Sequence, residues 1–395
     1  MITIKKQDIV NENRLLIIDD DIGVRDFIAD LAEESGYETE QTCNADEFIQ
    51  ACDSFNPTHI FIDLVMPETD GIQLLRLLAE RGSKAKICVM SGMDKKVLQT
   101  SQKLGEQLGL HMFASISKPA SVESLEALFL RAKHVRTVHT EKELRQALDE
   151  QQLVLHYQPK LSHTSEKISK VTGVEALIRW QHPQLGLIYP DAFIGLAEQS
   201  GLITRITETV VRLAVSQASE WHNQGLMLTV AINISPRNLI DLDMPDKFAA
   251  ILEEAGVEPA YFILEITETA AMAHVNDSAD ILTRFRLKNF SLSLDDFGTG
   301  YSSLKQLYQL PFSELKLDRS FVSEVDNSEE ARIIVKSLIE LAKNLGLKTC
   351  AEGVENQAIL AFCQQLGCDN VQGYYISKPL TAGEVTKFVQ EFRLP

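Results

Sequence analysis

The sequence has few cysteines, no long apolar run and no excess of positive charge, and each shortage excludes a class of protein. Its six cysteines are scattered without a CxxC pair, which is typical of reduced thiols in a cytosol and not of a disulfide framework. No apolar run approaches the roughly 18 residues of a membrane span, and the first residues, MITIKKQDIV, lack the apolar core of a signal peptide. We therefore expect a soluble, cytoplasmic protein without a membrane partner.

The shortage of positive charge limits which ligands the protein can bind. The formal net charge is -18, because 56 Asp and Glu residues outnumber 38 Lys and Arg residues. A chain with this charge repels polyanions, so we expect no DNA binding, and a small anionic ligand would need a metal ion or a local basic group. With 395 residues, of which 45% are hydrophobic, the chain is long enough for two domains with separate cores.

The order of strand-like and helix-like segments changes near residue 135, which indicates a boundary between two domains. Before it, strand-like runs such as RLLIIDD and HIFIDLVMP alternate with helix-like segments, which predicts a doubly wound, flavodoxin-like parallel sheet with helices on both faces. A charged helical segment follows, with Thr140 as a candidate N-cap and no Pro/Gly/Ser spacer. We predict a first domain over residues 1–133, a helical linker over 134–141 and a second domain over 142–395.

Polar residues of the first domain cluster where its strands end, which is where open α/β sheets bind ligands. Asp19 and Asp20 close the first strand, Asp63 the third and Ser91 the fourth, while Lys118 follows the fifth. The three carboxylates can bind one Mg²⁺, and Asp63 can act as a nucleophile toward a phosphoryl group whose oxygens bond to Ser91 and Lys118. We expect a phosphate-accepting pocket here.

These residues resemble the response-regulator receiver domain over about residues 13 to 132. The acidic pair, the run DLVMPETDG, the hydroxyl residue and the KP dipeptide all occur in the family's order. The resemblance implies that a sensor histidine kinase is the partner and that Asp63 is the phosphoacceptor. The chain departs from the family at Ser115, where an aromatic switch residue is usual, so the output through that face is expected to be unorthodox.

The sequence of the second domain predicts a barrel. Eight strand-like runs interleave with helical ones over about 250 residues, which suggests a (β/α)₈ TIM-like barrel whose active site lies at the C-terminal ends of the strands. Polar residues occur at these ends, and they are Gln158, Glu175, Asn233, Glu265, Asp295, Asp296, Lys316, Asp318, Glu352 and Gln372.

The run SLSLDDFGTG, residues 291–300, shows how such an end is built. Strand alternation turns Asp295 and Asp296 to opposite faces unless the chain bends, and Gly298 permits a bend. Carboxylates with one Asn amide, and without His or Cys, select hard cations such as Mg²⁺ or Mn²⁺. Acids this close need cations to stay ionised together, and Asp295 is placed to bridge two ions in a two-metal phosphodiester hydrolysis.

The same residues resemble the EAL phosphodiesterase family, which hydrolyses cyclic di-GMP. The match runs from about residue 142 to the C-terminus and includes the motifs EALIRW, YQPK, NIS, EITE, DDFGTGYSS, KLD, AEGVE and QGY. It implies that one ion is held by Glu175, Asn233, Glu265 and Asp295. It implies that a second ion is held by Asp295, Asp296 and either Glu352 or Asp318.

The resemblance implies further roles. Lys316 or Glu352 handles the proton of the attacking water, and Glu268 anchors a loop that the family uses near its dimer interface. The substrate site is expected to be lined by Gln158, Leu177, Arg179, Glu355 and Gln372. The chain is then a response regulator that hydrolyses cyclic di-GMP to linear pGpG, is modulated by phosphorylation and forms a homodimer or higher homo-oligomer. The alternative is a non-catalytic module that binds cyclic di-GMP and signals to a partner protein.

Overall fold

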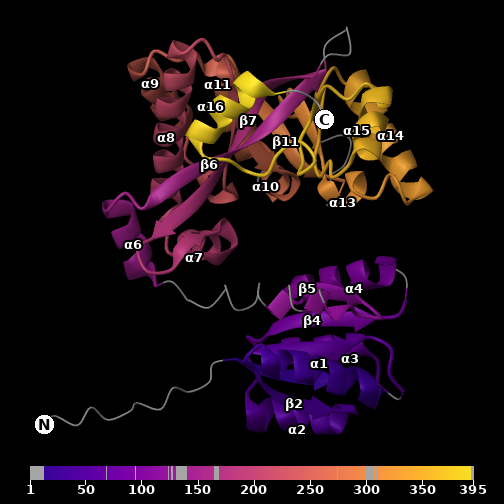
Figure 1. Cartoon of the computed structure of the whole chain (residues 1–395). Coiled ribbons are helices and arrows are strands. Elements are labelled where there is room, and N and C mark those ends of the chain that lie inside the picture. Colours follow the sequence, from indigo (N-terminus) through magenta and orange to yellow (C-terminus); the bar gives the residue numbers. More distant parts are fainter. Residues whose placement is uncertain are drawn as a thin grey trace, which may run out of the picture. The chain divides into compact units, whose positions relative to one another are not determined.

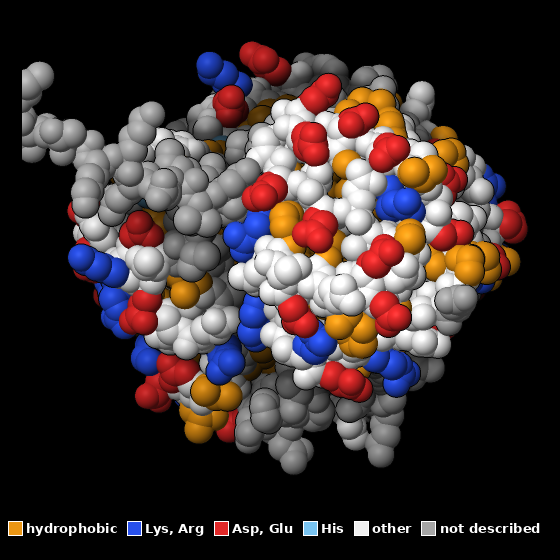
Figure 2. All heavy atoms as spheres, turned by 90° about the horizontal axis from the view of Figure 1, so that it is seen from below, with side chains coloured by type: hydrophobic (Ala, Val, Ile, Leu, Met, Phe, Trp, Pro, Cys, Tyr) orange, Lys and Arg blue, Asp and Glu red, His pale blue; other side chains and the backbone are white. Residues whose placement is uncertain are grey.

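The structure is a computed structural model that describes residues 13–392, apart from residues 68, 94, 123, 126, 127, 130–139, 164–168, 274, 299–306 and 308. The chain divides between residues 137 and 138 into two compact units, each with its own sheet and core (Figure 1). Acidic side chains are spread over the face shown in Figure 2, as the net charge leads one to expect. Among the described residues, no helix is both long and apolar enough to cross a membrane.

The first unit contains a five-stranded parallel sheet in the order β2-β1-β3-β4-β5, which confirms the doubly wound prediction. Its strands are β1 (Arg14–Ile18), β2 (Glu38–Thr42), β3 (His59–Asp63), β4 (Lys86–Ser91) and β5 (His111–Ser117). Its helices are α1 (Ile22–Glu34), α2 (Ala45–Phe55), α3 (Gly71–Glu80) and α4 (Lys95–Gln107). The helix expected after β5 falls partly outside the described residues.

Both faces of this sheet are apolar because successive residues of the central strands point to opposite sides. Leu16 and Ile18 of β1 belong to the core formed with α2, α3 and α4. Leu15 and Ile17 belong to a second core formed with α1. This two-sided burial leaves the strand ends as the accessible edge of the sheet.

The second unit begins with α6 (Glu141–Asp149), whose first turn has a capping box. The Thr140 hydroxyl accepts a hydrogen bond from the Glu143 amide at 3.2 Å, and the Glu143 carboxylate accepts one from the Thr140 amide at 2.8 Å. Thr140 is thus confirmed as an N-cap. The predicted linker otherwise lies outside the described residues.

The barrel of the second unit follows the ring order β6-β14-β13-β12-β11-β10-β9-β7, and β6–β7 pairing closes it. The strands are β6 (Leu153–His163), β7 (Ser169–His182), β9 (Thr229–Asn233), β10 (Phe262–Thr267), β11 (Ser291–Phe297), β12 (Glu314–Leu317), β13 (Lys348–Ala351) and β14 (Asn370–Val371). A short strand, β8 (Gly186–Ile188), pairs with β7 outside the ring. All eight predicted strands are therefore present, and the barrel fold is confirmed.

Helices surround this ring and bury its outer apolar face (Figure 1). They are α7 (Ile194–Gln199), α8 (Ile203–Asn223), α9 (Met244–Glu254), α10 (Glu268–Ala273), α11 (Val275–Leu287), α13 (Arg319–Val322), α14 (Glu329–Asn344), α15 (Gln357–Leu366) and α16 (Ala382–Glu391).

The expectation of eight strand-then-helix repeats is wrong in the first repeat. β6 pairs antiparallel with both of its neighbours, β7 and β14, and only the short segment 164–168 separates β6 from β7. Antiparallel strands can be joined by such a short connection, whereas a parallel pair needs a longer crossover. As a consequence Gln158 lies within β6, opposite Glu175, and not at the C-terminal end of a strand.

Candidate active site

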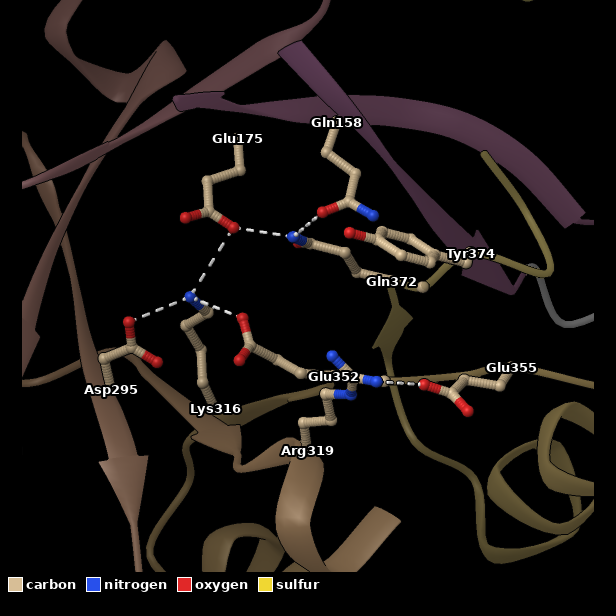
Figure 3. A pocket seen from close by; sticks show the side chains of 11 residues that line it. Gln158, Glu175, Asp295, Lys316, Arg319, Glu352, Glu355, Gln372 and Tyr374 are labelled. Carbon is tan, nitrogen blue, oxygen red and sulfur yellow. Dashed lines mark hydrogen bonds and ion pairs between the residues drawn. The ribbon is translucent and has the colours of Figure 1, made fainter. Parts of the chain in front are cut away.

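The ammonium group of Lys316 lies at the centre of the acids at the barrel mouth (Figure 3). Lys316 comes from β12 and is 1% exposed. Its Nζ lies 2.7 Å from Glu352 Oε1, 3.0 Å from Asp295 Oδ2, 3.0 Å from Glu265 Oε2 and 3.8 Å from Glu175 Oε2. The structure thus brings together carboxylates from β7, β10, β11 and the residue after β13 around one cation.

A second buried lysine, which our sequence reasoning missed, completes this arrangement. Lys160 Nζ lies 2.6 Å from Glu265 Oε1, and Lys160 is 3% exposed. The signal was available in the YQPK motif, because Lys160 follows Gln158 by two residues and therefore shares its face of β6. The two oxygens of Glu265 are each bonded to a different lysine.

Amide side chains hold Glu175 from two sides. Asn233 donates through Nδ2 to Glu175 Oε1 at 2.8 Å, and Gln372 donates through Nε2 to Glu175 Oε2 at 2.6 Å. Gln372 also donates to Gln158 Oε1 at 3.0 Å, and Gln158 donates to the carbonyl of Ser377 at 3.0 Å. This chain of bonds places four residues of the predicted set in one network.

The end of β11 bends where the sequence predicts a bend, but the bend starts two residues before Gly298. Asp296 itself has a positive φ of 56°, and Gly298 has a φ of 97°. The pairing of β11 with β12 shifts between Leu294 and Phe297. The expectation that Gly298 alone turns Asp296 is therefore incomplete, because a bulge and a left-handed aspartate contribute to the turn.

This bend forms a group of three acids. Asp295, Asp296 and Glu352 each offer a carboxylate oxygen, and these oxygens lie within 4.8 Å of one another. Asp318 instead begins α13 as its N-cap, with Oδ1 accepting from the Ser320 amide at 3.0 Å. Of the two candidates for the second ion, Glu352 is the one that joins this group.

Burial makes these acids hard to keep ionised without cations. It raises the pKa of Glu265 to about 8, with neighbouring Glu175 adding to the effect. Burial also raises the pKa of Glu352 to about 7 and that of Asp296 to about 6. For Glu175, burial acts in the same direction, but the two buried lysines outweigh it and lower the pKa to about 2. A set of oxygen donors with excess negative charge fits a hard divalent cation.

A cavity of about 240 Å³ opens above these acids. Arg319, Glu355 and Tyr374 line its rim, and the Arg319 guanidinium lies 2.5 Å from Glu355 Oε1 (Figure 3). Glu355 was in the predicted substrate set, whereas Arg319 and Tyr374 were missed. Each of the missed residues stands within two positions of a predicted one, Asp318 or Gln372.

Two predicted substrate residues continue β7 beyond Glu175. Leu177 is half-buried, and Arg179 is 6% exposed. The Arg179 guanidinium lies 4.8 Å from the ring centroid of Tyr189 and donates to the carbonyl of Ile178 at 2.8 Å. Its Nε has no hydrogen-bond partner among the described residues, and burial lowers the pKa of Arg179. Neither residue lines the cavity above the acids.

The predicted pocket of the first unit also assembles. Lys118 Nζ lies 2.7 Å from Asp63 Oδ2 and 2.5 Å from Asp19 Oδ2. Carboxylate oxygens of Asp19, Asp20 and Asp63 lie within 4.8 Å of one another. Ser91 is buried, and its hydroxyl accepts a hydrogen bond from the Met93 amide at 3.0 Å.

Burial and ion pairing have opposite effects on the charges of this pocket. Burial raises the pKa of Asp19. Burial opposes the charge of Lys118, but its hydrogen bonds to Asp19 and Asp63 outweigh that effect and raise its pKa. The oxygen donors fit a divalent cation, while Lys118 remains positively charged beside Asp63.

The two folds and their sites define a chain in which a receiver-like pocket precedes a barrel with an acidic, oxygen-rich mouth. The family model of the EAL domain matches residues 141–379, so the chain belongs to the EAL domain family. The model of the response regulator receiver domain matches residues 15–130. Both resemblances drawn from the sequence are confirmed.

Several named proteins are similar to this chain. "Cyclic di-GMP phosphodiesterase NbdA" of Pseudomonas aeruginosa is 39% identical over 72% of this chain and 36% of that protein. "Cyclic di-GMP phosphodiesterase RocR" of the same organism is 29% identical over 80% of this chain and 83% of that protein. The solved structure "PaMucR Phosphodiesterase, c-di-GMP complex" has a TM-score of 0.59 and 41% identity, covering 62% of this chain and 98% of that chain. This chain spans about a third of the length of NbdA.

Proposed function

We propose that this chain hydrolyses cyclic di-GMP to linear pGpG at the barrel mouth and needs Mg²⁺ or Mn²⁺ for the reaction. The observation that carries the proposal is the convergence of Glu175, Glu265, Asp295 and Glu352 on one small region of a barrel mouth. Similar proteins whose names state this activity support the choice of substrate.

The proposed ion sites use the residues that meet in the structure. Glu175, Asn233, Glu265 and Asp295 would hold one ion, and Asp295, Asp296 and Glu352 would hold the other. When bound, such ions would activate water and neutralise the charge that develops on the phosphate. The negative charge of the buried acids favours both sites.

The two candidates for proton transfer differ in their surroundings. Burial opposes the charge of Lys316, but the surrounding acids outweigh it and hold its pKa well above the usual value. Lys316 therefore keeps its proton and acts as a fixed positive charge. Glu352, whose pKa is raised by burial to about 7, can accept a proton at Oε2 near neutral pH, because its Oε1 lies 2.7 Å from the Lys316 ammonium. We assign proton transfer to Glu352 and charge stabilisation to Lys316.

Substrate binding is assigned to the fixed amides and the positive charges around the mouth. Gln158 and Gln372 are buried and already oriented by hydrogen bonds, so they can bind without a large loss of side-chain entropy. Arg319 at the cavity rim and Arg179 beyond it supply positive charge for the phosphates, and Leu177 and Glu355 complete the proposed substrate site.

Control is assigned to the first unit. We propose that a sensor histidine kinase phosphorylates Asp63, that Mg²⁺ binds there with Asp19 and Asp20, and that Ser91 and Lys118 bond to the phosphoryl oxygens. The ion pair between Lys118 and Asp63 supports this assignment. We further propose a cytoplasmic protein, consistent with the six free cysteines, that functions as a homodimer or higher homo-oligomer.

One assay separates the enzyme from a module that only binds. The full chain is incubated with cyclic di-GMP in Mg²⁺, in Mn²⁺ and in EDTA, and pGpG is measured by chromatography while binding is measured by calorimetry. We expect pGpG with either ion and none in EDTA. Tight binding without product would favour the binding module, and the absence of both would overturn the proposal.

A further inference from the structure

Lys160 lies in the acidic barrel interior, and the proposed reaction gives it no role. It lies on β6 two residues from Gln158, and its pairing partner is Gly173, two residues before Glu175 on β7. The antiparallel direction of β6 therefore places Lys160 one layer below the mouth. Lys316 lines the cavity above the acids, and Lys160 does not.

The contacts of Lys160 show which acid neutralises its charge. Its Nζ lies 2.6 Å from Glu265 Oε1, and both residues are almost fully buried, with side chains 4% and 0% exposed. Glu314 is an acid of the same barrel interior, but its two oxygens accept from Ser293 Oγ at 2.9 Å and from Asn370 Nδ2 at 3.1 Å. Glu265 is thus the acid with which Lys160 forms an ion pair.

The two lysines on Glu265 are not equivalent. Lys316 shares its ammonium among Glu265, Asp295 and Glu352, so a cation arriving from the cavity can replace its bond to Glu265 while the other bonds persist. Lys160 forms its only ion pair among the described residues with Glu265, and leaving that oxygen would bury an unpaired charge. Oε2 of Glu265 is therefore exchangeable, whereas Oε1 is held.

We infer that Lys160 is a specificity-determining residue, because it restricts Glu265 to a single oxygen for the divalent cation. The inference rests on the proposed ion site and extends it. Mg²⁺ and Mn²⁺ take compact octahedral shells, whereas Ca²⁺ takes six to eight oxygens and often a bidentate carboxylate. A Glu265 that can offer only one oxygen disfavours Ca²⁺ relative to Mg²⁺.

The test compares Lys160→Met with the unchanged residue in the full chain. Both proteins carry Asp20→Asn, which weakens the predicted ion site of the first unit. Binding of Mn²⁺ alone is followed by electron paramagnetic resonance, and Mg²⁺ and Ca²⁺ are titrated as competitors. Loss of a positive charge changes the affinities of both divalent ions in the same direction, so their ratio isolates the geometric effect.

We expect the Ca²⁺-to-Mg²⁺ affinity ratio to rise about tenfold in Lys160→Met, the size of effect seen when a partner of a metal ligand is removed. Lys170→Met, the same substitution at an exposed position of β7, should leave the ratio unchanged. An unchanged ratio in Lys160→Met, or a shift toward Mg²⁺, would overturn the inference while leaving the proposed ion site intact. Failure of all three ions to bind the parent protein would overturn both.

A second measurement covers the case in which Lys160→Met does not fold. A crystal structure of the unsubstituted chain grown with Mn²⁺ should show Glu265 giving one oxygen to the ion while Lys160 remains bonded to the other. Two oxygens of Glu265 on the ion, with Lys160 displaced, would contradict the inference.

Discussion

The amide of Gly298 donates a hydrogen bond at 3.0 Å to Oε2 of Glu268. Glu268 is buried at the first position of α10, directly after β10, and Gly298 follows the two acids at the end of β11. The bond therefore ties the turn that carries Asp295 and Asp296 to the neighbouring strand of the barrel.

Replacing Glu268 with alanine removes this acceptor. We expect turnover of cyclic di-GMP to fall by about 100-fold, because small misplacements of catalytic groups are costly, while the barrel stays folded. Glu268→Gln retains an oxygen that can accept from the Gly298 amide and should keep most of the activity. Product chromatography measures turnover, and fluorescence of Trp180 and Trp221, both in the barrel, reports folding. Equal losses in the two variants would show that this hydrogen bond is not what positions the turn.

Asp295 is the acid common to both proposed ion sites. Asp295→Asn keeps the shape of the side chain but removes a negative charge, so we expect turnover to fall by about 1,000-fold and Mn²⁺ binding to weaken. Asp280→Asn, at an exposed position of α11, is the matched control and should behave as the wild type. Near-normal turnover of Asp295→Asn after stripping and restoring Mg²⁺ would contradict the two-ion proposal.

The fold and the strand-end acids could be predicted because they depend on local pattern. Short apolar runs such as RLLII and HIFID, or alternation as in SLSLDD, indicate the strands, and a polar residue at a strand end is visible in the sequence without knowledge of its neighbours. The direction of β6 could not be predicted, since alternation is the same in parallel and antiparallel strands. That direction decides whether Gln158 and Lys160 lie at the mouth or below it.

Two features of the site could not be predicted, because one depends on a contact between residues far apart in the sequence and the other on an unusual backbone conformation. Lys160 is recognisable as part of the site only through Glu265, which is 105 residues away in the sequence. The sequence alone does not distinguish a buried lysine in a strand from a solvent-exposed one. The left-handed conformation of Asp296 is rare for a residue other than glycine, so the bend was assigned to Gly298. Tertiary contacts decide such positions, and single-sequence patterns do not contain them.

Phosphorylation of Asp63 should be measurable at the barrel. Asp63 lies 2.7 Å from Lys118, and a phosphoryl group would add charge that draws Lys118 and Ser91 toward it. We expect beryllofluoride or acetyl phosphate to change cyclic di-GMP turnover in the wild type and to have no effect in Asp63→Asn. The same response in both proteins would show that Asp63 is not the input.

The first unit also contains a buried histidine with a bearing on stability. His59 begins β3 and is 5% exposed, with the rings of Tyr37 and Phe113 at centroid distances of 5.2 Å and 5.7 Å. Its Nδ1 lies 3.0 Å from Thr58 Oγ1, and its Nε2 has no hydrogen-bond partner among the described residues. Burial, with a smaller effect from Lys86, lowers the pKa of His59 from 6.5 to about 4.

This shift predicts a loss of stability in acid. Between pH 6.5 and pH 4 the unfolded chain binds a proton at His59 that the folded unit does not, so protonation favours unfolding as the pH falls. We expect the free energy of unfolding of the first unit, relative to that of His59→Leu, to drop by about 3 kcal/mol across this range. Hydrogen exchange of β3 amides measures the difference, with His111→Leu, an exposed position of β5, as the control. Titration of the His59 ring by nuclear magnetic resonance in the folded protein with a midpoint near 6.5 would refute this prediction.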